Sequence, residues 1–183
     1  MKKPDDYGNN KGNGKHLELG GHRGYLRNVE ERISKARNEM LVVNFDFDDA
    51  DSQPNYFAKK YDADDRPNKK WQGTIYIVPS NKFGLSMLEG LCTAVERSNP
   101  GFTCWADNGI LKTEELTMKK VGIVVREEEY GKHDGSVGVT RKPFRFCTYE
   151  HAYEQEIPQK KKLRASEGFV QVDDFSEDGL PFG

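Results

Sequence analysis

The sequence has few apolar residues and no long apolar run. Hydrophobic residues make up 35% of the 183 positions and charged residues 32%, whereas globular chains usually contain about 45–50% and about 25%. No run approaches the ~18 apolar residues of a membrane-spanning helix, and the polar stretch from Met1 to Lys15 does not have the form of a signal peptide. We therefore expect a cytoplasmic protein with no membrane partner, part of whose chain lies outside the core.

Residues that build metal, disulfide or phosphate-binding sites are also scarce. Cys92, Cys104 and Cys147 are odd in number and form no CxxC pair, and the four histidines show no spacing of three or four. The Gly-rich stretch GNNKGNG near the start has no preceding strand, so it does not fit a phosphate loop. We predict no cofactor, no metal and no catalytic residue.

Positive charge is missing from the end of the chain. From Glu167 onward there are five acidic residues and no Lys or Arg, so the remaining residues carry a net charge of +3 within a total of −2. A mildly basic body with an acidic end favours interaction with nucleic acid. On charge alone, an ordinary surface with an acidic, solubilising end fits equally well.

Apolar periodicity predicts an all-β fold. Along residues 40–50, Leu41, Val43, Phe45 and Phe47 share one face, and we expect the opposite face, with Asn44 and Asp46, to meet solvent or ligand. The expected strands cover residues 22–34, 40–50, 71–79, 119–131 and 143–156, with loops at 49–70 and 132–142. A helix capped by Ser80 or Asn81 and stopped at Asn99 separates the third and fourth strands. This order is that of a five-stranded OB-fold, a Greek-key β-barrel with one helix between strands 3 and 4.

Three segments follow from these patterns. Residues 1–19 are polar and Gly-rich, and we predict a disordered arm. Residues 20–157 form the predicted OB-fold domain. Residues 158–183 form a predicted flexible linker, basic at first, and an acidic tail.

Basic and aromatic residues alternate between Tyr56 and Tyr76. Binding of single strands without sequence readout needs positive charge along the backbone and aromatic faces for the bases, and this stretch offers both. The sequence leaves open whether Trp71, which shares its parity with Ile75, packs in the core or stacks on a base. The predicted DNA-binding residues are Arg27, Asn44, Tyr56, Phe57, Lys59, Lys60, Lys69, Lys70, Trp71, Tyr76, Arg126, Lys132, Arg141, Lys142 and Arg145, of which Lys132, Arg141 and Lys142 are expected in the connection between the last two strands.

Two alternatives remain open. The run FDFDDAD clusters the carboxylates of Asp46, Asp48, Asp49 and Asp51, which suits Mg²⁺ in a nuclease, but no Lys or His at a motif distance completes such a site. The second alternative is a barrel that binds protein and not DNA.

Two stretches resemble known families. The end of the chain, VDDFSEDGLPFG, resembles the acidic tip of bacterial single-stranded DNA-binding proteins, which docks on replication, recombination and repair enzymes. The matching residues are Asp173, Asp174, Glu177, Asp178, Gly179, Leu180, Pro181 and Phe182, and the chain departs from that pattern by ending in Gly183. The partner-binding residues that the resemblance implies are Asp173, Asp174, Asp178, Leu180, Pro181 and Phe182. The stretches LEGLCTAVERSNPGF and LTMKKVGIVVREEEYG resemble phage and prophage proteins treated as single-stranded DNA-binding OB-fold proteins. The resemblance implies single-stranded DNA and replication or recombination proteins as partners, and it is compatible with a homo-oligomer.

Overall fold

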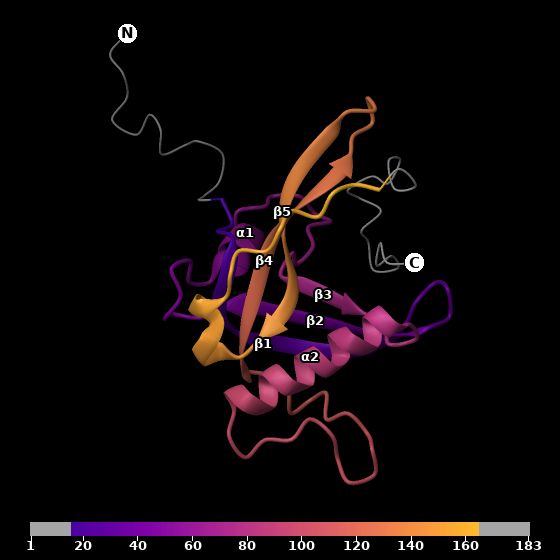
Figure 1. Ribbon diagram of the computed structural model, residues 1–183, viewed down its shortest axis with the longest axis vertical. Helices are drawn as coiled ribbons and strands as arrows, with labels where there is room; N and C mark the ends of the chain where they lie inside the picture. Colours follow the sequence, from indigo (N-terminus) through magenta and orange to yellow (C-terminus); the bar gives the residue numbers. More distant parts are fainter. Residues whose placement is uncertain (1–15, 165–183) are drawn as a thin grey trace.

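A computed structural model describes residues 16–164 of the chain (Figure 1). This part of the chain contains five strands, two α-helices and one 3₁₀ helix. In chain order they are β1 (Gly20–Ile33), β2 (Glu39–Phe47), α1 (Tyr56–Asp62), β3 (Thr74–Ile77), α2 (Lys82–Ser98), β4 (Lys120–Gly131), β5 (Val137–Cys147) and the 3₁₀ helix η1 (Tyr149–Glu154). None of the helices in this part of the chain is long and apolar enough to cross a membrane.

The five strands form one antiparallel sheet in the order β3-β2-β1-β4-β5. In a flat sheet of five strands the two edge strands lie about 19 Å apart, because neighbouring strands are about 4.8 Å apart. Here Cα atoms of β3 and β5 approach within 8 Å, so the sheet is strongly curled. Within residues 16–164 no ladder joins β3 to β5, and the sheet is therefore not closed into a barrel. The strand-rich, five-stranded part of the predicted fold is confirmed.

The core lies on the concave side of the sheet, as the alternation in β2 predicts. Leu41, Val43, Phe45 and Phe47 are all buried. The ring of Phe45 meets those of Phe57 and Phe146 edge to face, each at a centroid distance of 5.7 Å, an arrangement that favours aromatic pairs.

Helix α2 covers one side of this core (Figure 1). Its buried face includes Leu88, Leu91 and Val95, which recur at helical spacing. The Asn81 side chain caps the helix by accepting the Gly84 N–H at 2.7 Å, as the sequence predicts.

The opposite face of β2 differs from the expectation. Val42 and Asp46 are also buried, with exposed fractions of 3% and 0%. Val42 lies between Glu30 of β1 and Tyr76 of β3, while Asp46 accepts hydrogen bonds from the first turn of α1. Only Asn44 of this parity within β2 is partly exposed.

Element boundaries differ most at β5. This strand begins at Val137, six residues before the predicted start, and residues 149–154 form a 3₁₀ helix where the sequence predicts strand. The hairpin turn is consequently short, closed by the Lys132 N–H bonding to the Ser136 carbonyl at 2.8 Å. Pro143 lies at a register shift opposite Val125, where a residue without an N–H is tolerated in a sheet. The predicted loop 49–70 also contains the short helix α1.

The ordered structure continues beyond Ile157. The Lys161 N–H donates to the Glu127 carbonyl and the Glu129 N–H donates to the Lys161 carbonyl, both at 2.9 Å. The Glu129 carboxylate accepts the Leu163 N–H at 3.0 Å. Residues 161–163 therefore lie along the edge of β4, which fixes where the acidic end of the chain leaves the domain. Residues 1–15 and the six predicted tail residues lie outside the described part of the chain.

A buried hydrogen bond between side chains joins β1 to the segment after β2. Nδ1 of His22 lies 2.8 Å from Oδ2 of Asp51, and the His22 ring stacks on Phe47 at a centroid distance of 4.0 Å. The Asp51 carboxylate also accepts the backbone N–H groups of Arg23 and Gln53. Burial raises the pKa of Asp51, but these hydrogen bonds and the nearby imidazole hold it below its ordinary value of 3.8.

The Asp51 carboxylate should therefore make stability depend on pH. Because its folded pKa is depressed, its contribution is complete above the ordinary value of 3.8 and is lost as the pH falls through the folded pKa. Asp51→Asn should lower the free energy of unfolding by about 1–3 kcal/mol at neutral pH, and the difference from wild type should shrink below about pH 4. Urea unfolding at several pH values measures this, and a constant difference down to pH 3 would contradict it.

Candidate nucleic-acid interface

A bulge in β1 brings Arg27 to the surface. The β1–β2 register shifts between Leu26 and Asn28, so Arg27 is an extra residue with no partner across the ladder. Bulges of this kind redirect a side chain. The exposed guanidinium of Arg27 lies over the Trp71 ring, with its carbon 3.7 Å from the ring centroid.

Trp71 is held partly in the core and partly at the surface. Its indole N–H lies within hydrogen-bond distance of the carbonyls of Phe45 and Gly73, at 3.2 and 3.1 Å. Its ring packs on the core and also lies 5.9 Å from the ring of Tyr61. Trp71 therefore packs on the core in part, and its stacking on a base stays a prediction.

Tyr61 and Lys69 extend this arrangement. Nζ of Lys69 lies 4.2 Å from the Tyr61 ring centroid and donates to the Tyr61 carbonyl at 3.3 Å. Lys69, Tyr61, Trp71 and Arg27 thus form a row of two neighbouring rings with a cation at each end, which we call the first stack. A cation that lies over an aromatic ring is attracted by the ring, and this contact holds the ring in its orientation.

The outer face of β1–β3 adjoins the first stack. Asn28, Asn44 and Thr74 are aligned across the three strands. Asn44 donates to the Asn28 side-chain oxygen at 3.0 Å and accepts from the Thr74 hydroxyl at 2.6 Å. Tyr76 lies two residues further along β3 and is partly exposed. This face therefore presents fixed polar groups and one aromatic ring.

Helix α1 separates its aromatic residues from its basic ones. Phe57 is 3% exposed and packs edge to face on Phe45 and Phe47, so no face of its ring is available to a base. Tyr56 also packs on the core, and burial raises its pKa. Lys59 and Lys60 are exposed, as is Lys70 in the following loop. Phe57, predicted to contact DNA, is a core residue.

The predicted residues of β4 and β5 form a separate group around Phe144. The guanidinium carbons of Arg126 and Arg145 lie 4.2 and 5.5 Å from its ring centroid, and Arg126 is paired across the ladder with Lys142. This group is partly neutralised, since Arg126 bonds Glu128 at 3.0 Å. Burial lowers the pKa of Lys142.

The expected position of two of these cations is wrong. Arg141 and Lys142 belong to β5, because that strand starts early, and only Lys132 lies in the turn. Arg141 donates to the Leu17 carbonyl at 2.8 Å and lies 3.9 Å from Glu127. Figure 1 shows the far part of this hairpin projecting beyond the rest of the sheet.

Three of the four carboxylates of the FDFDDAD run, Asp46, Asp48 and Asp51, bind groups of the protein itself. Asp46 accepts the N–H groups of Phe57 and Ala58 at 2.9 and 3.0 Å, and so caps α1. Asp48 accepts the Tyr149 hydroxyl at 2.6 Å, and Asp51 binds His22. Across residues 16–164, no group of His, Cys, Asp and Glu is arranged to hold a metal ion. The cluster on which the nuclease alternative depends is therefore used structurally.

The sequence does not predict two further cation–aromatic groups. Arg23 lies over the rings of Tyr149 and Tyr153, at 5.1 and 4.5 Å, and Phe102 lies between Lys112 and Lys119. The partners of Arg23 are more than 120 residues away in the chain, so no local sequence pattern predicts that contact.

Comparison with known proteins adds no assignment: no protein-family model matches the chain, and a search of curated proteins gives no match.

Proposed function

We propose that the chain is a non-catalytic single-stranded DNA-binding protein. The first stack carries this proposal: the neighbouring rings of Trp71 and Tyr61, with Arg27 at one end and Lys69 at the other, lie beside a polar strand face. Single-strand binders combine cations that follow the phosphates with rings on which bases stack, and such binding tolerates any sequence. Arg27 suits both tasks, because a guanidinium stacks on a ring while it pairs with phosphate.

We further propose that the body is an OB-fold. The strand order β3-β2-β1-β4-β5, the close approach of β3 to β5 and the position of α2 between β3 and β4 all support it. In OB-folds oligonucleotides lie on the face of strands 2 and 3 and on the adjoining loops. Asn44, Thr74 and Tyr76 occupy that face here, next to the first stack.

The acidic end of the chain is proposed to recruit replication or recombination proteins during protection of single strands. Its support is the sequence: five carboxylates, no basic residue and the apolar pair Pro181 and Phe182. Carboxylates direct such a segment toward basic pockets on a partner. The edge of β4 holds residues 161–163, and the 19 residues after Arg164 are then long enough to reach a partner bound beside the domain.

A competition experiment tests the DNA proposal. A labelled oligo-dT of about 20 nucleotides, longer than the site of about 4–16 nucleotides expected for one OB-fold, is bound by the full chain and followed by fluorescence anisotropy. Unlabelled single strand should displace it at much lower concentration than a duplex of the same length, because a duplex hides the faces of its bases. Equal displacement by both competitors would overturn the proposal. Absence of any binding at low salt would favour the protein-interaction alternative.

A further inference from the structure

The connection between α2 and β4, residues 99–119, lies directly beside the bulge that exposes Arg27. Met118 donates its N–H to the Leu26 carbonyl at 2.7 Å, and Leu26 donates its own to the Lys119 carbonyl at 3.0 Å. Leu26 immediately precedes Arg27. The end of this connection is therefore attached to β1 at the edge of the first stack.

A second cation–aromatic group, with two lysines and one ring, lies in this connection. Phe102 is partly buried, and Nζ of Lys112 and of Lys119 lie 4.7 and 4.5 Å from its ring centroid. We call these three residues the second stack. Lys112 also lies 3.8 Å from Glu115, whose side chain is 64% exposed, so solvent screens that ion pair. Like the first stack, the second combines cations with an aromatic ring, here two lysines and one phenylalanine.

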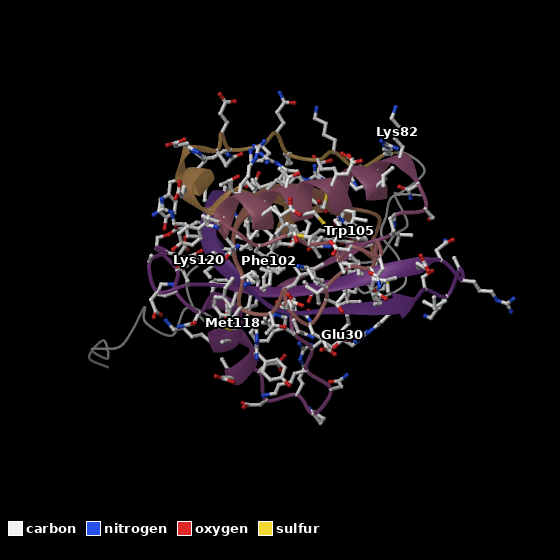
Figure 2. All side chains as sticks on the ribbon, turned by 90° about the horizontal axis from the view of Figure 1, so that it is seen from below. Glu30, Lys82, Phe102, Trp105, Met118 and Lys120 are labelled. Atoms are coloured by element: carbon white, nitrogen blue, oxygen red, sulfur yellow. The ribbon has the colours of Figure 1, made fainter. Side chains whose placement is uncertain are left out.

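Large apolar side chains are exposed next to the second stack. Trp105 is 43% exposed, Ile110 61% and Met118 66%. In Figure 2, Phe102, Trp105 and Met118 lie on the side of the molecule that faces the viewer, and Lys82 lies at the far end of α2. Exposed apolar side chains on the same connection as these lysines favour an interaction site.

Hydrogen bonds and core contacts fix the structure of this connection. Trp105 and Leu111 are bridged, and the Ala106 N–H bonds the Ile110 carbonyl at 2.9 Å, which makes a small hairpin. Cys104, Leu111 and Leu116 anchor it in the core with exposed fractions of at most 8%. The exposed rings are therefore held in place in the free protein, and ordering them on binding costs little.

We propose that this connection is a second subsite on the path of the single strand. Bases that leave the first stack pass over Met118 and stack on Phe102 and Trp105, while Lys112 and Lys119 contact the phosphates. The inference rests on the proposed function, and it extends the site from the strand face to a loop that OB-fold topology alone does not select. The combination of cations with aromatic rings favours nucleic acid over an acidic protein segment, because such a segment needs the charge but not the ring faces.

The two tryptophans of the chain allow each subsite to be observed alone. Trp71→Phe leaves Trp105 as the emitter, and Trp105→Phe leaves Trp71; each replacement retains a ring. Titration with oligo-dT of about 20 nucleotides should quench both proteins over the same range of DNA concentration. Quenching of Trp71 with no change in Trp105 emission would overturn the second subsite and leave the proposed function standing. Failure of both proteins and of wild type to bind would instead overturn the proposed function.

Charge reversal gives a matched affinity test. Lys119→Glu should weaken oligo-dT binding by roughly tenfold or more, whereas Lys82→Glu, the same change at the far end of α2, should have an effect of less than about twofold. Phe102→Leu keeps the apolar contact with the core and should cost roughly 5- to 150-fold. Circular dichroism checks that each variant folds, and the less disruptive Lys119→Gln replaces Lys119→Glu if that variant does not. Equal affinities for the Lys119 and Lys82 variants, or equal quenching of Trp105 by polyglutamate and by oligo-dT, would overturn the assignment to nucleic acid.

Discussion

Asp46→Ala should lower the free energy of unfolding by about 3 kcal/mol or more. The Asp46 carboxylate is fully buried and accepts the N–H groups of Phe57 and Ala58. Asn55, the residue that precedes α1, provides no side-chain cap. Alanine would leave both donors without an acceptor, and a buried unsatisfied donor costs about 1–3 kcal/mol. The small cavity left by the carboxylate adds to this cost.

Urea unfolding measures the effect, with Asp49→Ala as the matched control. Asp49 is three residues away and exposed, so its replacement should change stability by about 0.5 kcal/mol at most. Asp46→Asn retains one acceptor oxygen and should fall between the two. If Asp46→Ala were as stable as Asp49→Ala, the proposed cap of α1 would be wrong.

Trp71→Leu should weaken oligo-dT binding by roughly 5- to 150-fold, the effect of losing one base-stacking ring. Arg27→Ala should weaken it as well, and it should reduce the slope of log affinity against log salt by about 0.7, as expected for one lost phosphate contact to a single strand. Arg27 is exposed, so its variant should keep the stability of wild type. Trp71→Leu also loses the hydrogen bonds to Phe45 and Gly73 and should be somewhat less stable.

Anisotropy titrations at several salt concentrations measure both effects, with Lys82→Ala as the control. This variant removes one exposed cation from the start of α2 and should bind as wild type does. The first stack would lose its role if Arg27→Ala and Lys82→Ala gave the same affinity and the same salt slope.

The sequence predicts the inner face of the sheet better than its outer face. The alternation of Leu41, Val43 and Phe45 reflects the pleat of a strand, which is local, and those residues are buried as expected. Burial of Asp46 depends on α1, whose first turn is eleven residues further along and needs an acceptor for its N–H groups. Local alternation cannot reveal that contact.

The boundaries of β5 were predictable in part. The stretch Val137–Gly138–Val139 alternates as a strand does, but it falls in the Gly-rich segment 132–142, whose composition is typical of a loop. In the structure a Cβ on Gly138 would meet the Tyr130 ring at 2.5 Å, so glycine allows the two strands of the hairpin to approach. Pro143, where the strand is predicted to begin, lies within β5 at a register shift.

The sequence predicts part of the candidate site but not its arrangement. Arg27, Lys69 and Trp71 of the first stack are among the predicted DNA-binding residues, whereas Tyr61 is not. The contact between Arg27 and Trp71 depends on the bulge in β1, because Arg27 is the extra residue of that bulge and its side chain lies over the Trp71 ring. The pairing of Phe102 with Lys119 joins two ends of an irregular connection, where no periodicity exists to predict it.

Salt dependence of oligo-dT binding by the wild-type chain tests the central claim most directly. If Arg27, Lys69 and the lysines of the second stack contact phosphates, log affinity should fall linearly with log salt, with a slope of about −0.7 for each phosphate neutralised. Five such contacts, from Arg27, Lys69, Lys112, Lys119 and one further cation, predict a slope near −3.5 between about 50 and 200 mM salt. Affinity that does not change over this range, or no binding at its lower end, would contradict the account.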